Sequence, residues 1–212
     1  MTSKTLLKLL AAGLLLASES GQAAYHVDIH IAPSLYGTLN APLFLDFQLN
    51  SGGGASPATN SATIDHFSFT GGSATPGTIT TSGAVSGDLG SSVALADDAT
   101  NSYNEFFQSF SNGTTAISFD VLTSANANAP TPDWFAVALL DSSAGNLQLP
   151  TNALDGVSLF TVSIGDSNQA SSYTGVGSAA GITTSFVPSP ATLWLLAPGL
   201  AGLRLFGKRR AA

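Results

Sequence analysis

Positive charge is confined to the two ends of this 212-residue chain. All six lysines and arginines lie before residue 9 or after residue 203, and none lies between Tyr25 and Leu203. The same stretch carries twelve carboxylates, so its net charge is near −12, although that of the whole chain is −7. Because no lysine or arginine salt bridge can form there, its fold must be stabilised by apolar burial and hydrogen bonds.

The charge distribution and the composition also restrict the partners. Without a cationic patch to hold phosphates, nucleic acid is not an expected partner. Scattered carboxylates keep a surface soluble, and no cofactor is expected, but carboxylate and carbonyl oxygens also suit Ca²⁺, which stays open as an alternative. The chain has no cysteine, which excludes disulfides, zinc–thiolate sites and cysteine nucleophiles.

The first 23 residues have the pattern of a secretory signal peptide. Two lysines precede an uninterrupted apolar segment, residues 9–17, and small residues follow it. Cleavage is expected between Ala23 and Ala24, and cleavage one residue later fits the same pattern. The sequence therefore predicts an N-terminal signal helix over residues 1–23 and export from the cytoplasm.

The last 26 residues contain three segments in a fixed order. Val187, Pro188, Ser189 and Pro190 come first, and the two prolines are expected to end the last strand and begin an extended linker. Residues 191–206 are mostly apolar and are expected to form a transmembrane helix at the short end of the spanning range. A basic end, residues 207–212, follows with Lys208, Arg209 and Arg210, and the positive-inside tendency keeps it cytoplasmic.

This arrangement resembles the PEP-CTERM sorting tail of Gram-negative bacteria, also labelled the ice-binding protein C-terminal domain. Val187, Pro188 and Pro190 match its motif, with Ser189 where the family usually has Glu. The apolar segment matches its helix, and Lys208, Arg209 and Arg210 match its basic cluster. The resemblance implies recognition by a membrane-embedded exosortase after secretion, transient anchoring in the inner membrane, and processing near the motif. It also implies a final place at the cell surface or outside the cell, beside exopolysaccharide and biofilm matrix. The ice-binding label describes the tail and gives no evidence that this chain binds ice.

Residues 24–186, between the two targeting segments, are expected to fold as one all-β domain. Short apolar alternations recur between Gly- and Pro-rich stretches, which favours an antiparallel β-sandwich, jelly-roll-like or Ig-like. The expected strands are 25–31, 43–49, 117–121, 135–139, 160–164 and 182–187, with a hairpin turn over 141–145. Residues 97–110 have aromatic side chains at three- and four-residue spacing, which predicts a short helix or a strand-like turn that packs against the sandwich.

The sequence contains three candidate sites: a transition-metal site, a fragment of a calcium loop and an acidic pair. His26, Asp28 and His30 share one face of a strand, and Asp65 or His66 would complete a metal site, but a solvated polar face is the favoured interpretation. Asp97, Asp98 and Asn101 resemble a fragment of a calcium loop. Asp46 and Asp120 would flank a glycosidic bond only if the fold brought them together.

No catalytic signature was found. The chain has no G-x-S-x-G elbow and no marked partner for its three histidines. Trp134 is expected in the core rather than on a sugar-binding surface. The chain is therefore predicted not to be an enzyme.

Three functions remain in order of preference. The first is a structural or interaction protein of the cell surface or matrix. The second is a carbohydrate-binding module, with or without calcium, which two exposed aromatics on one face would favour. The third is a hydrolase, which two carboxyl groups in a cleft would favour.

Overall fold

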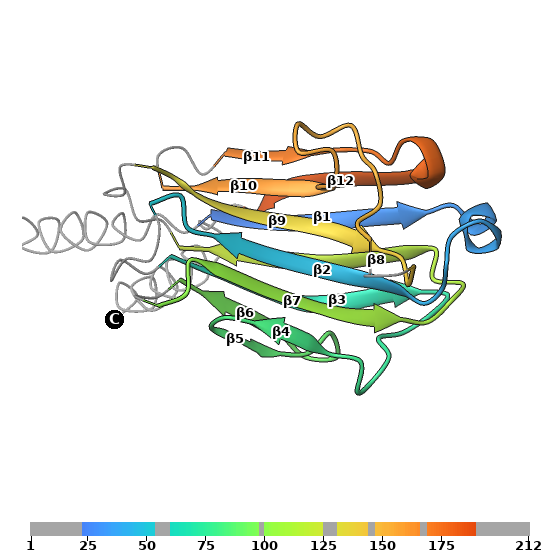
Figure 1. The fold of residues 1–212 in the computed structure, drawn as a ribbon, viewed down its shortest axis with the longest axis horizontal. Helices are drawn as coiled ribbons and strands as arrows, with labels where there is room; N and C mark the ends of the chain where they lie inside the picture. The colour runs from blue at the N-terminus through green and yellow to red at the C-terminus, as the bar shows by residue number, and fades with distance from the viewer. Residues whose placement is uncertain are drawn as a thin grey trace, which may run out of the picture.

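The computed structural model describes residues 23–53, 60–97, 100–124, 131–143, 147–165 and 169–189. These residues form two six-stranded antiparallel sheets that lie one behind the other in Figure 1. Two short 3-10 helices, η1 (Pro33–Gly37) and η2 (Gly177–Ala179), accompany them. The predicted all-β fold with antiparallel sheets is confirmed. The expected signal helix and the expected transmembrane helix lie outside the described residues.

The first sheet, called sheet A, has its N-terminal strand next to its C-terminal strand. In spatial order it consists of β12 (Ile182–Ser189), β1 (Ala23–Ile31), β8 (Ala116–Thr123), β3 (Ser61–Thr70), β6 (Val93–Ala96) and β5 (Val85–Gly87). The strand β12 therefore forms one edge of this sheet, and β1 lies between it and β8.

The second sheet, called sheet B, is built around β2. In spatial order it consists of β11 (Gln169–Ser172), β10 (Phe160–Ile164), β9 (Asp133–Leu140), β2 (Leu43–Asn50), β7 (Tyr103–Phe110) and β4 (Thr80–Ser82). All six segments in which alternation predicted a strand form strands. The return after residue 141 also forms, since Leu149 N donates to Leu139 O at 2.8 Å and Gln148 bridges Leu140.

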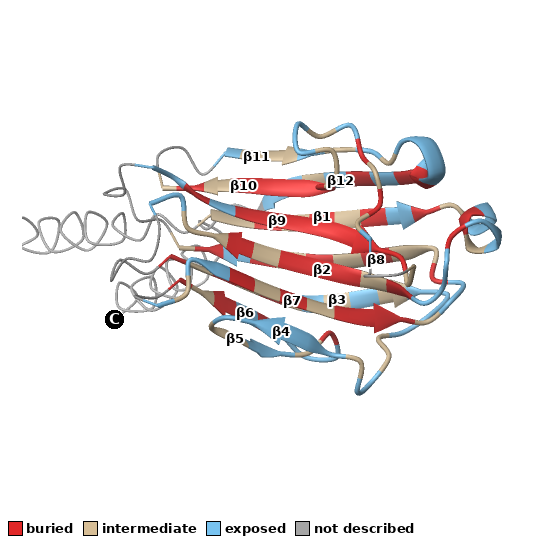
Figure 2. Ribbon diagram, in the orientation of Figure 1, coloured by how far each residue is buried: buried red, intermediate tan, exposed pale blue. Residues whose placement is uncertain are grey.

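The core lies between the sheets and is rich in phenylalanine. Phe47 on β2 is fully buried, and its ring centroid lies 5.5 to 6.3 Å from four others. Those four rings belong to Phe67, Phe106, Phe119 and Phe135. Burial runs along the central strands of both sheets in Figure 2, as expected where salt bridges with lysine or arginine are absent.

The helix considered for residues 97–110 is wrong, because residues 103–110 form β7. Asn104 and Gln108 face inward with Phe106 and Phe110, so the alternation is present but half of it is polar. Asn104 Oδ1 accepts from Ala84 N at 2.7 Å, and Gln108 Oε1 accepts from Leu89 N at 2.8 Å. These hydrogen bonds satisfy the two buried amide side chains, whose burial without a partner would destabilise the fold.

The last strand also extends further than expected. The prolines were expected to end it before residue 188, but β12 includes Pro188 and ends at Ser189. Pro188 pairs with Tyr25 in the register of β1. The edge position explains this, because an edge strand tolerates a residue without a backbone N–H.

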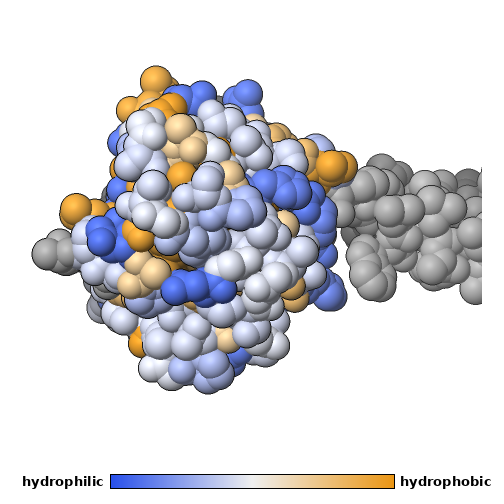
Figure 3. Space-filling view, turned by 90° about the vertical axis from the view of Figure 1, so that its right-hand side faces the viewer, coloured by the Kyte–Doolittle hydropathy of each residue, from blue (hydrophilic) through white to orange (hydrophobic). Residues whose placement is uncertain are grey.

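Loops and the two short helices η1 and η2 form the end of the sandwich at the right of Figure 1. In the view onto that end, hydrophobic residues are scattered among hydrophilic and weakly polar ones (Figure 3). Scattered apolar residues are ordinary on a protein surface and mark no site by themselves. The outer faces of the two sheets are more distinctive.

Candidate functional site

Three side chains form a row across the outer face of sheet B. Asn50 on β2 is paired with Tyr103 on β7 and with Trp134 on β9. Neighbouring strands lie about 4.8 Å apart, so the two aromatic residues are on strands about 10 Å apart. Each of the two is 41% exposed. This row, together with the neighbouring polar residues Gln48 on β2 and Glu105 on β7, is called the aromatic–amide face.

The expectation that Trp134 lies in the core is wrong. Phe135, Val137 and Leu139 face the core, so Trp134 is out of phase with them and faces outward. The other outward positions of β9 hold alanine and leucine and are buried, which makes the strand apolar on both faces. Tyr103 was likewise expected to pack against the sandwich and is exposed instead. The phase of the alternation would have identified both residues.

A hydrogen-bonded polar row lies next to the aromatic residues. Gln48 Nε2 donates to Asp46 Oδ2 at 2.7 Å and to Glu105 Oε1 at 3.4 Å. Tyr103 is hydrogen-bonded to Glu105, and burial together with this carboxylate raises the pKa of Tyr103. Tyr103 therefore stays a neutral phenol at ordinary pH, and the hydrogen bond to Glu105 holds its side chain in place.

Asp46 lies on the same side of β2 as Gln48 and Asn50 but does not reach the surface. The side chain is fully buried, and among the described residues its Oδ1 has no hydrogen-bond partner. Burial, then the nearby charge of Glu105, raises its pKa to about 7, against hydrogen bonds from Gln48 and Gln148. The acidic pair weighed from the sequence does not form, because Asp46 is on sheet B and Asp120 on sheet A.

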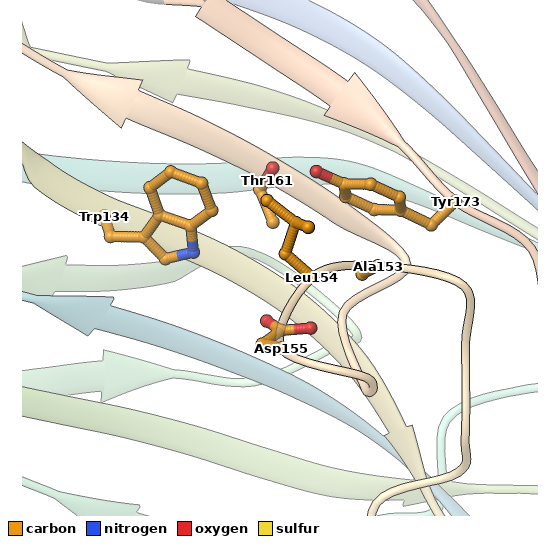
Figure 4. A pocket seen from close by; sticks show the side chains of 6 residues that line it. All are labelled: Trp134, Ala153, Leu154, Asp155, Thr161 and Tyr173. Carbon is orange, nitrogen blue, oxygen red and sulfur yellow. The ribbon is translucent and has the colours of Figure 1, made fainter.

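A hollow of about 140 Å³ adjoins the face beside Trp134. Its lining residues are Trp134, Ala153, Leu154, Asp155, Thr161 and Tyr173. Figure 4 shows the rings of Trp134 and Tyr173 on either side of Leu154 and Thr161. Pockets that enclose a drug-sized ligand measure about 300 to 1,000 Å³, so this hollow suits one ring-sized group of a longer ligand.

Asp155 shapes the loop that carries Leu154 into this hollow. Its Oδ1 accepts from Val157 N and Ser158 N, each at 3.0 Å, and the Ser158 hydroxyl donates to its Oδ2. Burial opposes ionisation, but these hydrogen bonds outweigh it and lower the pKa of Asp155. The ionised carboxylate therefore fixes the loop at neutral pH.

The residues expected at the two processing points meet at one end of sheet A. Ser189 pairs with Ala24, and Val187 pairs with His26 in the same register. Ala23, on the other side of the expected signal cleavage, pairs with Thr123 of β8. Pro190, the segment 191–206 and the basic residues Lys208, Arg209 and Arg210 lie outside the described residues.

The metal triplet weighed from the sequence does not converge. His26, Asp28 and His30 point outward along β1, as expected for a polar face. His26 instead approaches Asp120 of β8, which the sequence offered only as half of an acidic pair with Asp46. Of the calcium-loop fragment, Asp97 is buried and Asp98 lies outside the described residues.

Comparison with known proteins gives no match. No family model matches the chain, and no curated protein or solved structure matches it either. In the part of the chain that the structure describes, no helix is long and apolar enough to cross a membrane.

Asp46 should lower the free energy of unfolding as pH rises. Its pKa is raised from 3.8 to about 7, so the folded state keeps a proton that the unfolded chain loses above about pH 4. The penalty grows between these two pKa values and is constant above them. Asp46→Asn removes it, so the stability of the variant relative to wild type should increase by up to about 4 kcal/mol between acid pH and pH 8. Urea unfolding at a series of pH values measures this.

Asp155→Asn is the matched control, with the opposite sign. In the wild type, the pKa of Asp155 is lower in the folded state than in the unfolded chain. This carboxylate therefore adds stability at pH values above its unfolded pKa, and the added stability is lost as pH falls through its folded pKa. That variant should therefore lose stability relative to wild type at neutral pH and approach it at acid pH. A stability difference for Asp46→Asn that stays constant with pH would contradict the buried carboxylate described above.

Proposed function

We propose that this chain is an exported cell-surface protein whose β-sandwich binds neutral polysaccharide of the extracellular matrix through the aromatic–amide face. One observation carries the proposal: Trp134 and Tyr103 are both 41% exposed and flank Asn50 on one face. Tryptophan and tyrosine bury large apolar area when covered, so two of them left partly open in one row offer apolar surface that a ligand can cover.

The chemistry of the face suits a sugar chain. Aromatic rings offer flat apolar surface at low conformational cost, which the C–H face of a pyranose ring can cover. Asn50 and Gln48 add amide donors and acceptors for hydroxyl groups. The spacing of the aromatic strands and the adjoining hollow allow several sugar units of one chain to be contacted together.

The negative charge of the β-domain, called the body from here on, favours a neutral polysaccharide as ligand. There is no lysine or arginine between Tyr25 and Leu203, and Glu105 adds negative charge beside the aromatic rings. A polymer of uronates or phosphates would meet repulsion and would find no cationic partner. We therefore place neutral polysaccharide ahead of acidic polysaccharide as the ligand.

The proposal includes sorting by the tail. The secretion machinery and an exosortase would be the first partners, and the inner membrane would hold the chain briefly through residues 191–206. The pairing of Ala24 with Ser189 fits this proposal, because it places the two expected processing points side by side at one end of sheet A. The cell surface or the extracellular space would be the destination.

Substitution of the aromatic residues tests the binding function. Trp134→Ala and Tyr103→Ala should each weaken binding to neutral matrix polysaccharide by about tenfold, the equivalent of about 1.4 kcal/mol for one lost ring contact. Affinity electrophoresis of the full chain in gels containing the polysaccharide measures this loss. Leu122→Ala is the matched control, because Leu122 is 39% exposed on the outer face of sheet A. Equal binding by all four proteins would show that the face is not the site.

Intact mass tests the sorting function separately. In the native host, a chain that begins at Ala24 or Tyr25, ends near Pro190 and lies outside the inner membrane is expected. A chain that keeps Lys208, Arg209 and Arg210 and stays in the membrane would show a plain anchor, while leaving the polysaccharide result untouched.

A further inference from the structure

We propose that the outer face of sheet A holds a divalent transition-metal site made by Asp65, His66 and Asp120, with His26 bonded to the second carboxylate oxygen of Asp120. These residues come from three neighbouring strands, β1, β3 and β8. The site lies on the opposite sheet from the aromatic–amide face and does not depend on polysaccharide binding. It is called the histidine–aspartate cluster.

Asp120 is the centre of the cluster, with one carboxylate oxygen toward each imidazole. Its Oδ1 lies 2.6 Å from His26 Nδ1, and its Oδ2 lies 3.1 Å from His66 Nδ1. Asp65 Oδ1 approaches the same His66 nitrogen at 2.9 Å. The sequence suggested ligands along β1 alone, whereas the structure gathers them across the strands.

An irregularity in β3 brings His66 into the cluster. Asp65 pairs with Asp120 and Ser68 pairs with Ser118, so two residues of β3 stand opposite Phe119 alone. Phe67 packs against Phe119, with ring centroids 5.8 Å apart, which leaves His66 as the extra residue on the outside. His66 has φ of 52°, a conformation uncommon for a residue with a side chain. The bulge thus adds an imidazole beside two carboxylates.

The donor atoms have a spacing that suits a small ion. One ligand atom each from Asp65, His66 and Asp120 lies within 4.8 Å of the other two. Tetrahedral zinc with bonds of about 2.0 to 2.1 Å separates its ligands by about 3.3 Å, so the 2.9 and 3.1 Å separations need little change. His26 lies on the other side of Asp120, against its second carboxylate oxygen, where it can orient this ligand. Imidazole nitrogens favour a transition metal over Ca²⁺.

The local charge also favours a cation. Asp28, Asp65 and Asp120 place three carboxylates beside the two imidazoles, and the body has no lysine or arginine to offset them. Asp28 Oδ1 lies 3.7 Å from His26 Nε2, where it can orient the ring as an outer carboxylate does in zinc sites. His30 is further along β1 and pairs with Ala116, outside the cluster.

Calorimetric titration of the untagged full chain with Zn²⁺, in a mild detergent at neutral pH, tests the site. Wild type should bind one Zn²⁺ per chain. His66→Gly removes an imidazole while glycine accepts the positive φ, so the fold is kept. This variant and Asp120→Asn should each lose at least about tenfold in Zn²⁺ affinity. His30→Ala, the matched control on the same strand face, should bind as wild type does.

Each other result overturns the proposal. If folded wild type does not bind Zn²⁺, the cluster is a set of ion pairs and not a metal site. Unchanged affinity in His66→Gly would place the ion elsewhere, as would an equal loss in His30→Ala. Saturation by Ca²⁺ but not by Zn²⁺ would replace the transition-metal site with an oxygen-ligand site. Circular dichroism of each variant separates loss of binding from loss of fold.

Discussion

The packing of phenylalanine rings around Phe47 is the interaction on which the rest of this structure depends. The body has no lysine or arginine, so no such ion pair can hold its sheets together, and apolar burial must do so. Four rings from both sheets surround Phe47 at centroid distances of 5.5 to 6.3 Å. The polar side chains that enter this layer, such as Asn104 and Gln108, are neutral amides bonded to backbone.

That core leaves the two outer faces free to differ. On sheet B, two exposed aromatic rings flank Asn50, and the buried Asp46 lies further along β2 on the same side of the strand. On sheet A, a bulge in β3 brings His66 and Asp65 to Asp120. Both faces gather residues that are far apart in sequence, and both use strands fixed by the same core. In the account proposed here, one face meets polysaccharide and the other holds a metal ion.

Alternation was sufficient to predict the strands with a purely apolar inner face, such as β1 and β2. It did not predict β7, where half of the inward residues are polar. On β9 it predicted the strand, and the phase of that strand, with Phe135, Val137 and Leu139 inward, places Trp134 outside. In β3, the three-residue step from Ile64 to Phe67 breaks the period of two and marks the bulge. The pairing of Asp65 with Asp120 across β3 and β8 depends on sheet order, which no local pattern in the chain specifies.

The most direct measurement of the central claim is the fluorescence of Trp134 during titration with sugar. The chain has two tryptophans, so Trp194→Phe makes Trp134 the only one. The probe is the neutral oligosaccharide fraction of the host's matrix polysaccharide, with its acidic fraction for comparison. The account predicts a saturable change in emission with the neutral fraction and a much weaker one with the acidic fraction. Emission that stays constant with the neutral fraction, or responds only to the acidic one, would contradict it.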